Sequence, residues 1–158
     1  ARVSAGQGGR GGLGGGRADG CAPAATGFAG GTDAIRPVRP NTIARSLAIG
    51  NPAECWYALD EVRKSGGAIA SVTDDEIRDA IGLLARTEGI FAETAGGVTV
   101  ATLAKLAAQG IVRRDERVVA MITGHGLKTL DAVSDRLSPT FTIEPTRAAF
   151  EAAYSQED

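Results

Sequence analysis

The chain has 158 residues, enough for one domain with a hydrophobic core, and a net charge of −2 with acidic and basic residues interspersed. That balance argues against a nucleic-acid-binding face and a polybasic membrane-binding tract, and no apolar run reaches the roughly 18 residues that span a bilayer. Cys21 and Cys55 lack metal-ligand spacing and are interpreted as free thiols of a reducing compartment. The single histidine, His125, excludes a metal site made of several imidazoles. We therefore expect a soluble, cytoplasmic protein that handles a small molecule.

The opening segment is rich in glycine: residues 1–20 contain nine glycines, three arginines and one acidic residue, without apolar periodicity. This composition is typical of disorder, so we expect residues 1–17 to lack regular structure and to represent a truncated or non-native start. A phosphate-binding glycine loop would need a strand before it and a helix after it, and the pattern provides neither.

The rest of the chain shows a periodicity that predicts strands alternating with helices. In chain order the predicted elements are a strand end and turn at 18–25, helices at 42–49 and 53–64, a strand at 68–72, helices at 73–86 and 94–109, a strand at 118–122, a helix at 129–137, an extended piece at 140–143 and a helix at 145–154. This order predicts an α/β fold, a three-layer α-β-α arrangement with a mostly parallel sheet. Trp56, on the second helix, is interpreted as a core residue in preference to a ligand platform.

The helix at 73–86 begins with acidic residues. Thr73 and Glu76 have the spacing of a capping box, in which each side chain accepts a hydrogen bond from the other residue's backbone amide. Asp74 and Asp75 stand with Glu76 at the positive end of the helix, where carboxylates are stabilised by about 0.3–1 kcal/mol each. A metal cluster is the alternative for these acids, and the capped helix start is the favoured interpretation.

Two stretches combine small residues with the ends of predicted elements. The helix at 94–109 opens with Thr-Ala-Gly-Gly, which allows either a flat ligand or a packed sheet to approach the backbone. Within residues 117–128, the run 118–122 is continuously apolar, which suits a strand covered on both faces of the sheet. The run stops at Thr123, Gly124 and Gly126, and the chain restarts as a helix. Thr123 lies at the carboxyl end of that strand, where open α/β sheets bind ligands. On spacing alone, an ordinary strand-to-helix turn is the commoner explanation.

Five motifs, in this order and at these spacings, resemble the carboxyl-terminal part of threonine synthases. These are pyridoxal-phosphate enzymes of fold-type II, related to tryptophan synthase β and threonine dehydratase. The motifs are IGNPA at 49–53, SGG at 65–67, VTDDEI at 72–77, EGIFAETAGGVTVA at 88–101 and TGHGLK at 123–128. The resemblance implies that residues 18–158 are the carboxyl-terminal part of a pyridoxal-phosphate-dependent enzyme domain, and that the fold-type II domain is incomplete here.

The resemblance also implies a lyase of threonine biosynthesis, which converts O-phospho-L-homoserine and water to L-threonine and phosphate with pyridoxal 5'-phosphate as cofactor. Thr123 corresponds to the family's residue that faces the pyridine nitrogen, and a hydroxyl there, unlike an aspartate, does not hold that nitrogen protonated. Gly124, Glu93 and Thr94 correspond to segments that border the cofactor and substrate. The implied partner is a small-molecule substrate, without nucleic acid or membrane, and a homodimer of the full-length form is left open.

The chain departs from the family in three respects. His125 stands where an asparagine is expected, and a tolerated turn substitution is a simpler explanation than a general-base role. Arg17, with glycines before it, stands where a strand leading to a glutamine or similar residue is expected. The lysine that forms an imine with the cofactor is absent, because Lys64, Lys105 and Lys128 match other positions of the family. The family's phosphate-binding glycines are absent as well. We therefore assign no catalytic residue and expect no threonine synthase activity from this chain alone.

Two other functions remain open. One is a dehydratase-like pyridoxal-phosphate enzyme acting on threonine or serine, and the other is a non-catalytic α/β module that binds an amino acid or pairs with a subunit. The ETAGG sequence at 93–97 together with TGHGLK at 123–128 favours threonine synthase over the dehydratase. The absence of the cofactor-linking lysine favours the non-catalytic module.

Overall fold

The computed structural model describes residues 2–5, 11–136 and 142–154. The strands are β1 Arg2–Ala5, β2 Gly12–Ala18, β3 Ala68–Val72 and β4 Val118–Ala120. The α-helices are α1 Pro23–Ala29, α2 Cys55–Lys64, α3 Asp74–Glu88, α4 Thr94–Ala108 and α5 Arg147–Tyr154. The 3₁₀ segments are η1 Asp19–Cys21, η2 Arg45–Leu47 and η3 Gly126–Ala132.

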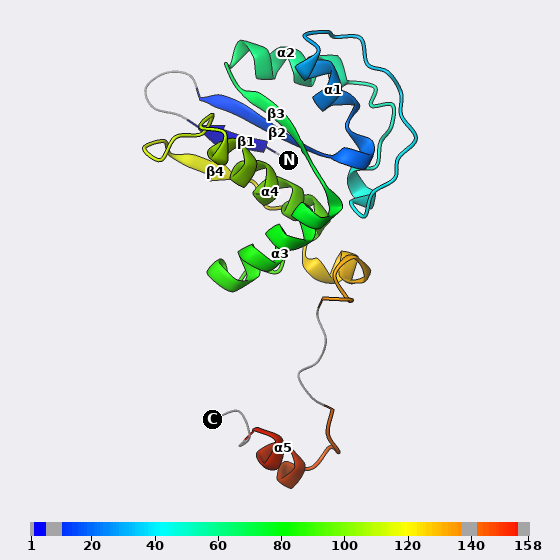
Figure 1. Cartoon of the computed structure of the whole chain (residues 1–158), viewed down its shortest axis with the longest axis vertical. Helices are drawn as coiled ribbons and strands as arrows, with labels where there is room; N and C mark the ends of the chain where they lie inside the picture. The colour runs from blue at the N-terminus through cyan, green and yellow to red at the C-terminus, as the bar shows by residue number, and fades with distance from the viewer. Residues whose placement is uncertain (1, 6–10, 137–141, 155–158) are drawn as a thin grey trace.

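The strands form one sheet in the order β3-β2-β1-β4. β2 is parallel to β3, whereas β1 is antiparallel to both β2 and β4, so β2, β3 and β4 all run in one direction. Helices α1 and α2 lie on one face of the sheet, α4 lies on the other, and α3 packs against α4 (Figure 1). The predicted α/β class, with three layers and a mostly parallel sheet, is confirmed.

The glycine-rich opening segment contains strands β1 and β2, so the prediction of disorder over residues 1–17 is wrong for them. Because the glycines of β2 have no side chains, the sequence shows no strand periodicity there, and neighbouring elements can pack closely against the strand. A Cβ on Gly16 would lie 2.3 Å from the Thr102 hydroxyl oxygen, and one on Gly67 would lie 2.1 Å from the Leu13 carbonyl oxygen. Glycine therefore allows α4 and the turn after α2 to approach β2 closely.

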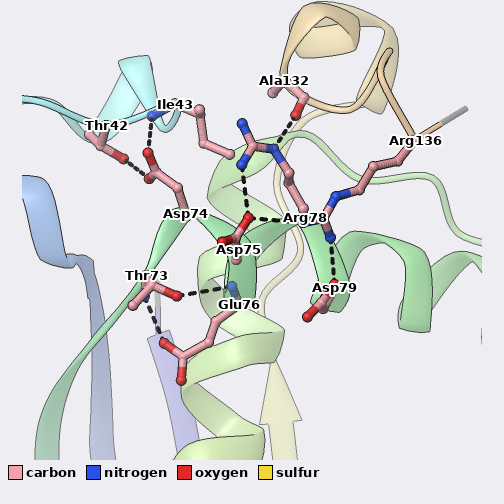
Figure 2. A network of polar contacts seen from close by, with 10 residues as sticks. All are labelled: Thr42, Ile43, Thr73, Asp74, Asp75, Glu76, Arg78, Asp79, Ala132 and Arg136. Atoms are coloured by element: carbon pink, nitrogen blue, oxygen red, sulfur yellow. Dashed lines mark hydrogen bonds and ion pairs between the residues drawn. The ribbon is translucent and has the colours of Figure 1, made fainter.

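The segment before α2 forms only the short η2 turn in place of the helix predicted at 42–49. The Asp74 carboxylate accepts hydrogen bonds from the Thr42 hydroxyl at 2.6 Å and from the Ile43 amide at 3.2 Å (Figure 2). A side chain that binds the backbone in this way competes with helical hydrogen bonding and holds the segment in a non-helical path.

The capping box at the start of α3 is confirmed. The Thr73 hydroxyl accepts a hydrogen bond from the Glu76 amide at 3.1 Å, and the Glu76 carboxylate accepts one from the Thr73 amide at 2.7 Å (Figure 2). Helix α1 was not predicted, although Pro23 opens it with the fixed φ that suits a first helical turn.

Two apolar residues are more exposed than the sequence predicts. Trp56 is 49% exposed and stacks on Tyr57, so its interpretation as a core residue is wrong. Val119 in β4 is 60% exposed, so the predicted cover on both faces of that strand is also wrong.

The core is divided between the two faces of the sheet. On the α3 and α4 side, Val72, Ile77 and Val98 are fully buried. Under α1 and α2 a smaller cluster includes Leu59 and Cys55. Both cysteines are free thiols, as predicted, and both are buried. No helix in the described residues is both long and apolar enough to cross a membrane.

The carboxyl-terminal region differs from the prediction in its first part. Residues 126–132 form the 3₁₀ segment η3 where a helix at 129–137 was predicted, and residues 137–141, which include the start of the predicted extended piece, lie outside the described residues. Helix α5 begins at Arg147, close to the predicted start at 145, and lies apart from the sheet in Figure 1.

Candidate functional site

The two stretches singled out in the sequence lie side by side. The Glu93 amide donates to the Gly124 carbonyl at 3.2 Å, and the Gly126 amide donates to the Phe91 carbonyl at 2.9 Å. Ala92 and His125 form an isolated antiparallel β-bridge between these contacts. The beginning of α4 is therefore joined through its backbone to the turn that follows β4.

The two glycines of that turn are required by close neighbours. Gly124 has φ of +70°, in the left-handed region, and a Cβ on it would lie 2.1 Å from the Glu93 carboxyl carbon. A Cβ on Gly126 would lie 2.5 Å from the Phe91 ring. These contacts give the Gly-x-Gly spacing a structural reason that does not depend on a ligand.

Glu93 is the most buried carboxylate at this junction, with 5% of the residue exposed. It stands at the N-cap position of α4, where the helix dipole favours a negative charge, although its side chain makes no capping hydrogen bond. The Lys128 ammonium lies 3.2 Å from its carboxylate oxygen. The buried charge is thus compensated by a cation that comes from η3.

Thr94 follows Glu93 and is fully buried. Its amide donates to the Thr129 hydroxyl at 3.2 Å, which ties the first residue of α4 to η3. Its own hydroxyl oxygen is buried without a hydrogen-bond partner in the described residues. A buried hydroxyl without a partner is uncommon in folded proteins, and it leaves a polar atom free beside Glu93.

Thr123 lines a cavity of about 600 Å³. Thr123 is exposed, and its hydroxyl makes no hydrogen bond to another described residue. The opposite wall comes from β2, where Gly14 and Gly15 present bare backbone and Arg17 adds a guanidinium, and Tyr57 of α2 contributes an aromatic side. Volumes of about 300–1,000 Å³ are typical of small-molecule sites. Thr123, Gly124, Glu93 and Thr94 are therefore neighbours in the structure, but of these four only Thr123 lines the cavity.

His125 is exposed and caps η3, since its Nδ1 accepts a hydrogen bond from the Leu127 amide at 3.2 Å. Its ring meets the Phe91 ring edge-on, with 5.9 Å between the ring centroids. It does not line the Thr123 cavity. The structure thus gives it a local role in the turn.

Comparison with known proteins identifies the family. A family model described as pyridoxal-phosphate dependent enzyme matches residues 13–124, most of the chain. The chain belongs to this family. The match starts inside β2, so the family region begins earlier than residue 18, where the resemblance in the sequence was predicted to begin.

Among the relatives of this chain are two threonine synthases. That of Methanocaldococcus jannaschii is 48% identical over 117 residues, which are 73% of this chain and 29% of the relative. That of Methanosarcina acetivorans is 44% identical over 120 residues, 75% of this chain and 30% of the relative. The chain thus spans less than a third of the length of these relatives.

The crystal structure of the T.th. threonine deaminase is also similar, with a TM-score of 0.49 and 18% sequence identity over 61% of this chain and 34% of that one.

The residues around the Thr123 cavity fit pyridoxal phosphate. A neutral hydroxyl without a partner suits the ring nitrogen, bare glycine backbone suits the face of a flat ring, and a guanidinium suits an anion. The lysines do not contribute, because none of the three in the sequence lines this cavity. Lys64 pairs with Asp60, Lys105 donates to the Ser71 carbonyl, and Lys128 pairs with Glu93.

Proposed function

We propose that this chain is the carboxyl-terminal part of a cytoplasmic threonine synthase, which converts O-phospho-L-homoserine and water to L-threonine and phosphate. The observation that supports this most directly is the position of Thr123. Its free hydroxyl lines a cavity at the carboxyl end of β4, beside the start of α4, in a chain 48% identical to a threonine synthase over 117 residues.

The proposal gives Thr123 the task of binding the pyridine nitrogen of the cofactor. Bound pyridoxal phosphate supplies an electron sink for negative charge on the substrate, and its strength depends on the charge at that nitrogen. A hydroxyl can donate a hydrogen bond to a neutral nitrogen without protonating it, whereas a carboxylate would favour the protonated form. Thr123 would therefore hold the ring in place while keeping its electron demand moderate.

The neighbouring residues would support this task. Gly124 sets the direction of the chain directly after Thr123, and Glu93 and Lys128 hold the turn against α4 through their ion pair. We propose that Gly124, Glu93 and Thr94, which do not line the cavity themselves, border the cofactor site from behind Thr123 and hold that residue in position.

The residues of this chain alone do not complete the reaction. The three lysines are engaged outside the cavity, so we expect no stable covalent link between this chain and pyridoxal phosphate. Incubation with the cofactor, borohydride reduction and peptide mapping would show only scattered, sub-stoichiometric labelling. Stoichiometric labelling of one lysine would contradict the proposed inactivity of the chain.

The proposed function is tested in an enzyme as long as the relatives, in which this chain forms the carboxyl-terminal part. We expect phosphate release and threonine formation from O-phospho-L-homoserine, and Thr123→Val should impair both more than Thr123→Ser, which keeps the hydroxyl. Release of ammonia from threonine or serine without turnover of O-phospho-L-homoserine would replace the proposal with a dehydratase. Equal activity of the valine and serine variants would remove the proposed role of Thr123.

A further inference from the structure

Arg17 points into the Thr123 cavity. It is the second-last residue of β2, and alternate side chains along a strand face opposite sides of the sheet. The preceding residue, Gly16, faces α4, because a Cβ there would lie 2.9 Å from Val98 and 2.3 Å from the Thr102 hydroxyl oxygen. Arg17 therefore faces the α2 side, where it lines the same cavity as Thr123.

The Arg17 guanidinium has donors to spare. It gives one hydrogen bond, from Nη1 to the carbonyl of Gly16 at 3.0 Å, and it forms no ion pair with any described carboxylate. A guanidinium carries five N–H donors, so several remain for a ligand. Among the described residues that line the cavity, Arg17 is the only positively charged one.

Two acidic residues share the cavity with Arg17. Glu54 and Glu61 line the same cavity, but both are exposed, so water screens their repulsion of an anion. The Arg17 charge also reaches the first residue of α2, where it lowers the pKa of the Cys55 thiol against the larger raising effect of burial. The positive field of Arg17 thus extends into the space between β2 and α2.

We propose that Arg17 binds a phosphate monoester in the Thr123 cavity and is thereby a specificity-determining residue of the site. The proposal rests on the proposed function, in which the cofactor and the substrate O-phospho-L-homoserine each carry such a group. A planar guanidinium can give two parallel hydrogen bonds to phosphate oxygens, a geometry that a lysine ammonium cannot reproduce. The experiment separates the two sources of the phosphate.

The experiment uses the 158-residue chain and two matched ligand pairs, measured by isothermal titration calorimetry. One pair is O-phospho-L-homoserine and L-homoserine, and the other is 4-deoxypyridoxine 5'-phosphate and 4-deoxypyridoxine, which lack the aldehyde and cannot react with lysines. We expect the phosphorylated member of at least one pair to bind about 10- to 100-fold more tightly, as for hydrogen bonds to a charged group. Fluorescence of the single tryptophan, Trp56, next to the cavity residue Tyr57, gives a second readout.

Three variants identify the group responsible for that preference. Arg17→Gln should abolish it, Arg17→Lys should retain a reduced preference, and the control Arg114→Gln should leave it unchanged. The control removes the same charge from an exposed residue outside the cavity. Circular dichroism and urea unfolding confirm that each variant is folded.

Each outcome decides the proposal. Loss of the preference in the homoserine pair alone assigns Arg17 to the substrate phosphate, and loss in the deoxypyridoxine pair alone assigns it to the cofactor phosphate. A preference that survives in Arg17→Gln, or no preference in either pair for the unmodified chain, overturns the proposal. Failure of the proposed function appears separately, as absence of threonine formation in the full-length enzyme.

Discussion

Replacing Gly124 by alanine tests whether the turn after β4 is held in shape by Glu93. Alanine at φ of +70° costs about 1–2 kcal/mol, because L-residues are strained in the left-handed region. The added Cβ would also lie 2.1 Å from the Glu93 carboxyl carbon, so the buried side chain must shift and its ion pair with Lys128 is disturbed. A buried polar group that loses its partner costs about 1–3 kcal/mol. The free energy of unfolding should therefore fall by about 2–5 kcal/mol.

Gly110 provides a matched control for this prediction. It follows α4 with φ of +72°, and a Cβ there would meet no atom within 4 Å. In urea or guanidinium titrations of both variants, the free energy of unfolding of Gly110→Ala should therefore fall only by the cost of the strained backbone, about 1–2 kcal/mol. In a Glu93→Ala background, which removes the clashing carboxyl, Gly124→Ala should cost no more than Gly110→Ala does. Equal costs for Gly124→Ala and Gly110→Ala in the unmodified chain would refute the steric argument.

Three further substitutions test other parts of the fold. Thr73→Ala removes the hydroxyl that accepts from the Glu76 amide and should cost about 1 kcal/mol in urea unfolding, whereas Thr73→Ser should cost much less. Burial raises the pKa of the Cys55 thiol in the folded state. The stability that the neutral thiol contributes is therefore fully present below the pKa of the thiol in the unfolded chain, and it is lost as the pH rises through the pKa in the folded chain. Unfolding titrations should therefore show a steeper loss at alkaline pH in the unmodified chain than in Cys55→Ala. Arg78→Met removes the 2.8 Å hydrogen bond from Nε to the Ala132 carbonyl and should cost about 1–2 kcal/mol, and an unchanged midpoint would show that η3 is held by other contacts.

The sequence predicts the elements well where side chains carry the pattern. Helix α3 has the capping box that was predicted from the spacing of Thr73 and Glu76, and it buries Ile77, Ala80 and Ile81 on one face. Helix α4, predicted at 94–109, spans Thr94–Ala108 and is followed by Gly110, which takes a positive φ. In both cases the helical period and the end signals are local in sequence, so no tertiary information was needed.

The prediction fails where tertiary contacts decide the structure. The segment around Thr42 and Ile43 has a helix-like pattern, but it binds the Asp74 carboxylate, 31 and 32 residues away in sequence. Strand β2 has almost no side chains to show a period of two, and only its fit under α4 makes its glycines necessary. For the same reason, only part of the candidate site was predicted. Thr123 was found from its place after an apolar strand, whereas the wall formed by β2 was predicted to be disordered.

The small residues at the start of α4 have two different roles: some allow close packing, and one lines the Thr123 cavity. A Cβ on Gly97 would lie 2.8 Å from the Ile81 side chain and 2.9 Å from the Ile77 carbonyl, and one on Gly96 would lie 2.7 Å from Ala92. Both glycines are therefore explained by close packing, the alternative that the sequence left open beside a flat ligand. Ala95 alone of this run lines the Thr123 cavity. Any ligand of the cavity thus meets α4 at Ala95 alone among the described residues, and the polar groups that can select it come from Thr123, from Arg17 of β2 and from the side chains of α2.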